Sequence, residues 1–179
     1  MDAHLRAGVA VYNDGEYHDA HDAWEGLWLD LENGTEDERL LHGLIQFTAA
    51  VFHARNGNWT GAVGLADSAR GYLRPLAAEY RGVNVDTVRS FLAALEADPE
   101  RIERARPPAL RVDGEALLYD DLSDDAAVIA AGVVAAEYGY DESAREAAAR
   151  FARAQLADGA ETGAFKPLVL DFLEESAAR

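Results

Sequence analysis

The chain has 179 residues, of which 33 are acidic and 16 are basic, so its formal net charge is −17. It contains no cysteine, which excludes disulfides, thiolate zinc sites and a cysteine nucleophile. Hydrophobic residues make up 49% of the chain, so we expect a substantial buried core rather than disorder.

The acidic excess indicates which partners and which environment to expect. A surface this negative repels phosphate backbones and anionic membranes, so we expect neither nucleic acid nor membrane as a partner. Molar salt would screen the self-repulsion, because it shortens the Debye length to about 3 Å. We interpret the excess as adaptation to a salt-filled cytoplasm; the alternative is a merely acidic protein of a low-salt organism. No secretory signal and no membrane-spanning run is visible, which predicts a cytoplasmic location.

The periodicity of apolar residues and the capping signals predict helices along the whole chain. Asn13-Asp14-Gly15 ends the first helix, and Thr35 with Glu38 matches a capping box at the start of the third. The third helix is apolar on nearly every face, so we expect it to be central. The predicted helices span residues 2–12, 16–32, 36–55, 59–75, 86–97, a short turn after 98, 123–138, 141–157 and 164–177.

No run alternates apolar and polar residues over the length of a strand, and residues 109–119 are predicted to be mostly loop. The fold class is therefore all-α, an antiparallel bundle of about seven to eight helices with short loops. A boundary near Gly82 would separate an N-terminal bundle, residues 1–82, from a C-terminal helical segment, residues 83–179. We expect the two parts to pack as one body.

The second predicted helix carries an unusual pair of polar residues. His21 and Glu25 lie one turn apart, beside a second stacked pair formed by Trp24 and Trp28. An imidazole and a carboxylate next to two indoles would lie at or near the core, where each polar group needs a partner.

A polar stripe on the third helix can face this pair. His42, Gln46, Ala49 and His53 fall within roughly 40° of one line on the helix surface. The stripe is about 16 Å long, so one small site can include only one of its two ends. We therefore expect either His42 or His53, together with Gln46, to meet the pair formed by His21 and Glu25.

Two interpretations of these residues compete. In the first, Glu25 accepts hydrogen bonds in a closed structural network, and loss of one partner would cost about 1–3 kcal/mol. In the second, His21, Glu25 and His53 bind a divalent metal ion and leave one coordination position for water. Such a site would support hydrolysis near neutral pH.

Other candidates are weaker. His18 forms a His-x-x-His pair with His21 but flanks a charged face, and His4 has no visible partner. Trp24, Trp28 and Trp59 are predicted to be core residues rather than a ligand platform. The acidic run over residues 120–125 is predicted to favour a helix N-terminus.

At these residues the chain resembles the domain of unknown function 309 family. The resemblance covers roughly residues 8–75 and depends on two motifs, Tyr12-Asn13-x-Gly15-x-Tyr17-x-x-Ala20-His21-x-x-Trp24-Glu25-x-x-Trp28 and Gly43-Leu44-Ile45-Gln46-x-x-Ala49-Ala50-x-x-His53, the latter followed by Gly57-Asn58-x-x-Gly61-Ala62. The resemblance implies a helical bundle and a metal-dependent hydrolase without a defined substrate.

The leading hypothesis is therefore metal-assisted hydrolysis of a small molecule. His21, Glu25 and His53 would bind the metal ion. The catalytic residues would be Glu25, His21 and Gln46, and Gln46 would orient the substrate or a water molecule. The alternative is a non-enzymatic binding or assembly module whose His/Glu network is structural. The Ala-rich helices over residues 126–136 and 143–154 would pack within the chain or form a homodimer.

Overall fold

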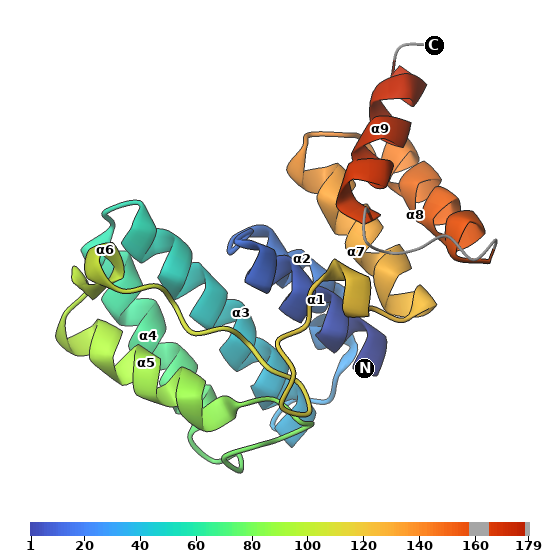
Figure 1. Ribbon diagram of the computed structural model, residues 1–179. Helices are drawn as coiled ribbons and strands as arrows, with labels where there is room; N and C mark the ends of the chain where they lie inside the picture. Colours follow the sequence, from blue (N-terminus) through green and yellow to red (C-terminus); the bar gives the residue numbers. More distant parts are fainter. Residues whose placement is uncertain (158–164, 178–179) are drawn as a thin grey trace.

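The computed structural model describes residues 1–157 and 165–177 (Figure 1). These residues form helices joined by loops and contain no strand, which confirms the all-α prediction. Two short 3-10 turns, Asp19–His21 and Tyr119–Asp121, accompany the α-helices. The helices are α1 (Asp2–Asp14), α2 (Asp22–Asp30), α3 (Glu36–Arg55), α4 (Trp59–Leu73), α5 (Val85–Ala97), α6 (Arg101–Arg104), α7 (Asp124–Glu137), α8 (Glu142–Ala157) and α9 (Phe165–Ala177).

Helix α3 has the predicted bounds and packs closely against α4. It begins where the Thr35 hydroxyl accepts a hydrogen bond from the Glu38 N–H at 3.3 Å, and the chain reverses after Asn56 at Gly57. Gly43 permits the close contact with α4, because a Cβ atom there would lie 2.5 Å from Leu73 Cδ2. The two helices therefore form one side of the N-terminal part of the molecule (Figure 1).

Helix α2 is held on α1 by a buried tryptophan. The Trp24 ring lies so close to α1 that a Cβ atom on Gly8 would be 2.2 Å from it. Its indole Nε1 donates to the Leu5 carbonyl at 3.3 Å. Because a glycine of α1 admits a whole indole ring, this contact determines which face of α2 points inward.

The second predicted helix, residues 16–32, is shorter than expected. The chain first makes the 3-10 turn Asp19–His21, and α2 then runs from Asp22 to Asp30. Leu31 has extended backbone, with ψ of 148°, and so ends α2 before the predicted stop at Asn33-Gly34. Both Ala20 in the turn and Trp24 in α2 are fully buried.

The C-terminal helices contact the start of the chain. Helix α7 packs on α1 and α8, and α9 packs on α7 and α8 (Figure 1). The long connection between α6 and α7 runs back to α1, where the Asn13 side chain bonds the Leu110 and Leu117 carbonyls at 2.8 and 2.9 Å. Outside the 3-10 turn at its end, this connection contains isolated bridges, which confirms the prediction of mostly loop.

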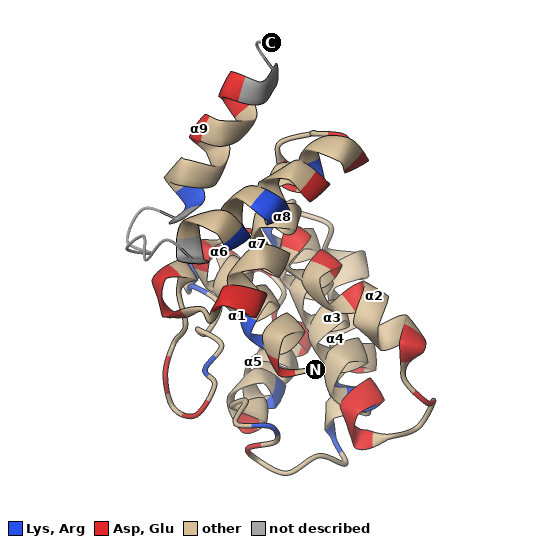
Figure 2. Cartoon of the chain, turned by 90° about the vertical axis from the view of Figure 1, so that its right-hand side faces the viewer, with Lys and Arg blue, Asp and Glu red and all other residues tan. Residues whose placement is uncertain are grey.

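The predicted boundary near Gly82 falls between α4 and α5. These two helices pack against each other, and the division of the chain into residues 1–82 and 83–179 stays a prediction. The alanines of α7 that are fully buried, residues 126, 127, 130, 131 and 135, pack within the chain. None of the helices that the structure describes is both long and apolar enough to cross a membrane. Figure 2 shows acidic residues on most helices and loops, with fewer basic ones.

Candidate functional site

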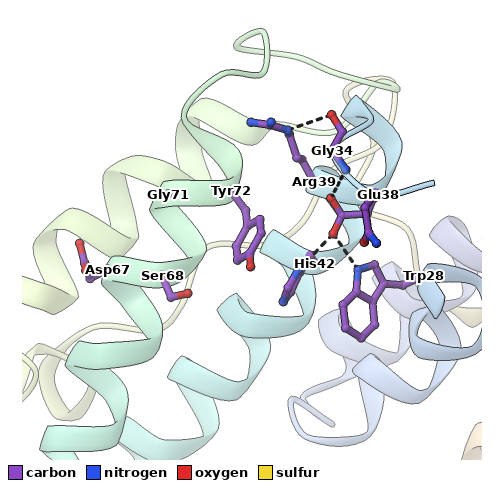
Figure 3. A pocket seen from close by; sticks show the side chains of 10 residues that line it. Trp28, Gly34, Glu38, Arg39, His42, Asp67, Ser68, Gly71 and Tyr72 are labelled. Atoms are coloured by element: carbon purple, nitrogen blue, oxygen red, sulfur yellow. Dashed lines mark hydrogen bonds and ion pairs between the residues drawn. The ribbon is translucent and has the colours of Figure 1, made fainter. Parts of the chain in front are cut away.

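A cavity of about 600 Å³ lies where α2, α3 and α4 meet. Trp28 from α2 forms one wall, Glu38 and His42 from α3 form the floor, and Ser68 and Tyr72 from α4 lie opposite (Figure 3). Helix α3 supplies Glu38 and His42 one turn apart, so both side chains lie on the same face. This is the candidate binding site.

The floor of the cavity is a continuous chain of hydrogen bonds centred on Glu38. Its Oε1 accepts from Trp28 Nε1 at 3.0 Å and lies 3.2 Å from His42 Nδ1, while Oε2 accepts from the Gly34 N–H at 3.3 Å. Gln46 Nε2 lies 2.9 Å from His42 Nε2. The pattern assigns the imidazole proton to Nδ1, so that His42 donates to Glu38 and accepts from the Gln46 amide.

The Glu38 carboxylate stays ionised although it is largely buried, since its side chain is only 7% exposed. Burial by itself would raise the pKa of Glu38. The hydrogen bonds from Trp28, Gly34 and His42 together outweigh the burial, and the pKa lies below its usual value. Glu38 therefore acts as a fixed negative charge at the floor of the cavity.

The imidazole of His42 is packed between two aromatic rings. Its centroid lies 3.8 Å from that of Tyr72 and 4.5 Å from that of Trp28. Its two nitrogens are engaged by Glu38 and Gln46, so ring orientation and hydrogen bonding are both fixed. Gln46 Oε1 is buried and accepts no hydrogen bond from the described residues. His42 is thus a fixed part of the floor of the cavity.

Glu25 does not join this network, contrary to the prediction of a buried His/Glu pocket. Its side chain is exposed, and within the described residues it makes no hydrogen bond or ion pair. Trp24 occupies the inward face of α2, and the next residue points about 100° away from it. The carboxylate that meets the third helix's imidazole is therefore that of Glu38.

The predicted metal ligands His21, Glu25 and His53 are also not brought together. His21 Nδ1 contacts the His18 carbonyl, and Nε2 lies 3.1 Å from Asp22 Oδ1. His53 Nδ1 instead lies 2.7 Å from Asn58 Nδ2, at the turn between α3 and α4. Among the described residues, the group that could hold a cation is His21, Asp22 and Glu25, whose ligand atoms lie within 4.8 Å of one another.

The remaining candidates have local roles. The His18 ring stacks on Phe52 with centroids 4.7 Å apart. His4 is not a solvated side chain without a partner, because its Nδ1 lies 2.9 Å from the Ala23 carbonyl. In the acidic run, the Asp121 carboxylate accepts a hydrogen bond from the Leu118 N–H at 2.9 Å. Trp24 is core as predicted, whereas Trp28 is half-buried and lines the cavity.

Glu38, Ser68 and Tyr72 were not predicted as site residues. The sequence indicates Glu38 as half of a capping box, but in the structure only the Thr35 half is made, and the Glu38 side chain turns into the cavity. Its spacing of four residues from His42 is the signal that could have identified it. Ser68 and Tyr72 carry no such local signal.

Comparison with protein families supports the resemblance seen in the sequence. Residues 5–65 match the model of the family described as Domain of unknown function (DUF309). The matched segment includes Trp28, Glu38 and His42, whereas Ser68 and Tyr72 lie beyond it. Comparison with curated proteins gave no match. The family description names no activity.

Proposed function

We propose that the chain is a helical binding module that holds a small polar molecule in the cavity between α2, α3 and α4. One observation supports this proposal most: the cavity has a preformed floor, in which Trp28, Glu38 and His42 are fixed by mutual hydrogen bonds. Because these side chains are already ordered, a ligand would bind without the cost of immobilising them. The volume of about 600 Å³ suits a small molecule.

The opposite wall offers groups that a ligand could bond. The hydroxyls of Ser68 and Tyr72 make no hydrogen bond within the described residues, and Asp67 contributes an exposed carboxylate (Figure 3). A few polar groups around a partly aromatic cavity are typical of sites that orient a small ligand. His42 is less suited to catalysis, because both its nitrogens are engaged and no nucleophile is bonded to it.

Two glycines of α4 provide a matched test of this site. A Cβ atom would meet nothing within 4 Å at either Gly71 or Gly64, and both positions are exposed, so a side chain can start there without a clash. Gly71 lines the cavity, whereas Gly64 does not. A library of small polar fragments would be screened by NMR, with the Trp28 indole N–H as the reporter.

We expect fragments that shift the Trp28 signal to lose binding in Gly71→Trp and to keep it in Gly64→Trp. The binding proposal fails if no fragment reaches Trp28, or if both variants behave alike.

A second function, metal-assisted hydrolysis, is favoured by the group formed by His21, Asp22 and Glu25. One imidazole nitrogen and two carboxylates are suitable donors for a divalent ion, and His21 Nε2 faces the Asp22 carboxylate. These residues fit such an ion without His53. A cation bound there would supply Lewis-acid chemistry for the hydrolysis of a small substrate.

Metal analysis of protein purified without a His-tag tests this second function. We expect one equivalent of metal in the unmodified chain and in His53→Ala, and its loss in Glu25→Gln and Asp22→Asn with folding intact. Retention of metal in Glu25→Gln, or no metal in the unmodified chain, would refute it.

A further inference from the structure

A second cavity, of about 320 Å³, lies directly beside the first. It is formed between α4 and α5, and Asp67 and Gly71 line both cavities. Its other walls include three arginines, Arg70, Arg74 and Arg89, and the hydroxyl-bearing Ser90. The chain has only 16 basic residues against 33 acidic ones, so three arginines around one small cavity are a marked local departure from the charge of the whole chain.

The three arginines are not equivalent. Arg89 Nη1 donates to the carbonyls of Leu73 and Leu76 at 3.2 and 2.9 Å, and its Nη2 bonds Asp86 at 3.1 Å. Arg89 therefore closes the C-terminal end of α4 and has a structural role. Arg70 bonds Glu96 through Nη1, which leaves its other N–H groups for a further acceptor.

Arg74 and Ser90 supply the unused donors. Both are exposed, and within the described residues neither side chain makes a hydrogen bond or an ion pair. A guanidinium presents donors in a planar fork that matches the oxygens of a phosphate or a carboxylate. Since the rest of the surface repels anions, an anionic group would be favoured at this cavity over other places on the molecule.

We propose that the molecule bound in the first cavity carries an oxyanion, a phosphate or a carboxylate, that lies in the second cavity between Arg70, Arg74 and Ser90. This inference rests on the proposed binding function. The shared wall at Gly71 has no side chain, so one molecule can extend from one cavity into the other. The Asp67 carboxylate keeps the anionic group on the arginine side and can accept a hydrogen bond from the ligand's neutral part.

The test is an NMR titration of the full chain with inorganic phosphate and, separately, with acetate. The reporters are the Arg70 and Arg74 Nε–H signals and the Ser90 amide. Arg74→Gln removes one unpaired guanidinium from the cavity, and Arg101→Gln makes the same charge change at an exposed site in α6. We expect saturable shifts, with binding weakened about tenfold in Arg74→Gln and unchanged in Arg101→Gln. The anion that binds more tightly shows whether the ligand's oxyanion is a phosphate or a carboxylate.

The inference is overturned if the shifts do not saturate, or if the two variants bind alike. In either case, fragments that bind at Trp28 would leave the proposed binding function standing. Saturable anion binding at Arg74 without any fragment at Trp28 would also overturn the inference, because the two cavities would then not share one ligand.

Discussion

The N-terminal helices α1–α4 and the C-terminal helices α7–α9 both bury apolar side chains, but they differ in the contacts that accompany this packing. In the N-terminal part, two glycines let neighbouring helices approach closely, Gly8 under the Trp24 ring and Gly43 under Leu73. The buried Glu38 has its charge satisfied by hydrogen bonds from within the same part of the chain. Shape and internal hydrogen bonding therefore determine this arrangement.

In the C-terminal part, a group of charged side chains adds to the apolar contact between α7 and α1. Lys166 at the start of α9 bonds Asp14 at 2.6 Å and Glu16 at 3.1 Å, both near the end of α1. Burial lowers the pKa of Lys166, but its bonds to Asp14 and Glu16 outweigh this effect and leave the pKa raised. Burial raises the pKa of Glu137, at the end of α7, to about 7; Lys166 opposes this, and Glu16 and Asp19 add to it.

The comparison indicates that pH and salt should affect helices α7–α9 more than helices α1–α4. Close apolar packing depends little on pH or salt, whereas a contact between charged groups changes with both. The C-terminal helices should therefore loosen under conditions that leave α1–α4 intact.

The largest effect is expected from Trp24→Ala, which removes the side chain that orients α2 on α1. Loss of a fully buried indole should lower the free energy of unfolding by about 3–5 kcal/mol. Chemical denaturation measures the change. Leu29→Ala, at a side chain that is 68% exposed on the same helix, should change stability by less than about 0.5 kcal/mol. Similar losses in both variants would contradict the inward face assigned to α2.

The next effect is expected from Glu38→Gln, which removes the charge at the centre of the hydrogen-bond network. We expect a loss of about 1–3 kcal/mol, because an amide cannot accept all three bonds and leaves a buried group unsatisfied. Glu25→Gln, at the exposed carboxylate of the original prediction, is the matched control and should be nearly neutral. Equal losses would restore Glu25 as part of the network.

The lowered pKa of Glu38 also predicts how the stability of the fold changes with pH. Its pKa is lower in the folded state, so its contribution to stability is present above the unfolded pKa and is lost as pH falls through the folded pKa. Stability in Glu38→Gln should therefore vary less with acidic pH than in the unmodified chain. A fully unchanged acid profile would show that the Glu38 charge does not stabilise the fold.

A smaller effect, of opposite sign, is expected at Glu137. Its pKa is raised to about 7 in the folded state, so its contribution is present at low pH and is lost as pH rises through that value. Hydrogen exchange of α7 and α9 should become faster as pH rises through this range, after correction for intrinsic rates, while α3 stays protected. Glu137→Gln should remove the change, and Glu174→Gln, at an exposed position of α9, should keep it. Equal loosening of α3 would contradict the comparison.

The smallest effect per residue is expected from salt. Each exposed acidic side chain contributes well under about 1 kcal/mol of repulsion, and KCl screens it. We expect the temperature of unfolding to rise from dilute buffer to molar KCl, as adaptation to a salt-filled cytoplasm predicts. Unchanged stability across the series would favour the alternative of a merely acidic protein.

The sequence predicted best those features that neighbouring residues determine. The bounds of α3 are the predicted ones because Thr35 caps its start and Asn56-Gly57 marks its end. Of the predicted polar stripe, His42 and Gln46 do bond each other, and the carboxylate bonded to His42 is Glu38 of the same helix rather than Glu25. Each of these signals lies within a few residues along the chain.

The exclusion of Glu25 from the network could not be predicted in the same way. The contact of Glu38 with His42 follows from their spacing of four residues on α3. Whether Glu25 joins them depends on the rotation of α2, and this rotation is determined by the contact of Trp24 with Gly8 on another helix. The arginine-lined cavity likewise joins α4 to α5, and the Lys166 contacts join residues about 150 positions apart. Spacing along one helix carries no information about such contacts.

The packing of α7 on α1 has a consequence for synthesis on the ribosome. Helix α1 has to wait for a partner that is made more than one hundred residues later. Until then, part of its apolar surface is open to chaperones or to other nascent chains. A stalled chain that ends before α7 should therefore be more prone to aggregate than the finished protein, even though α2, α3 and α4 are already complete.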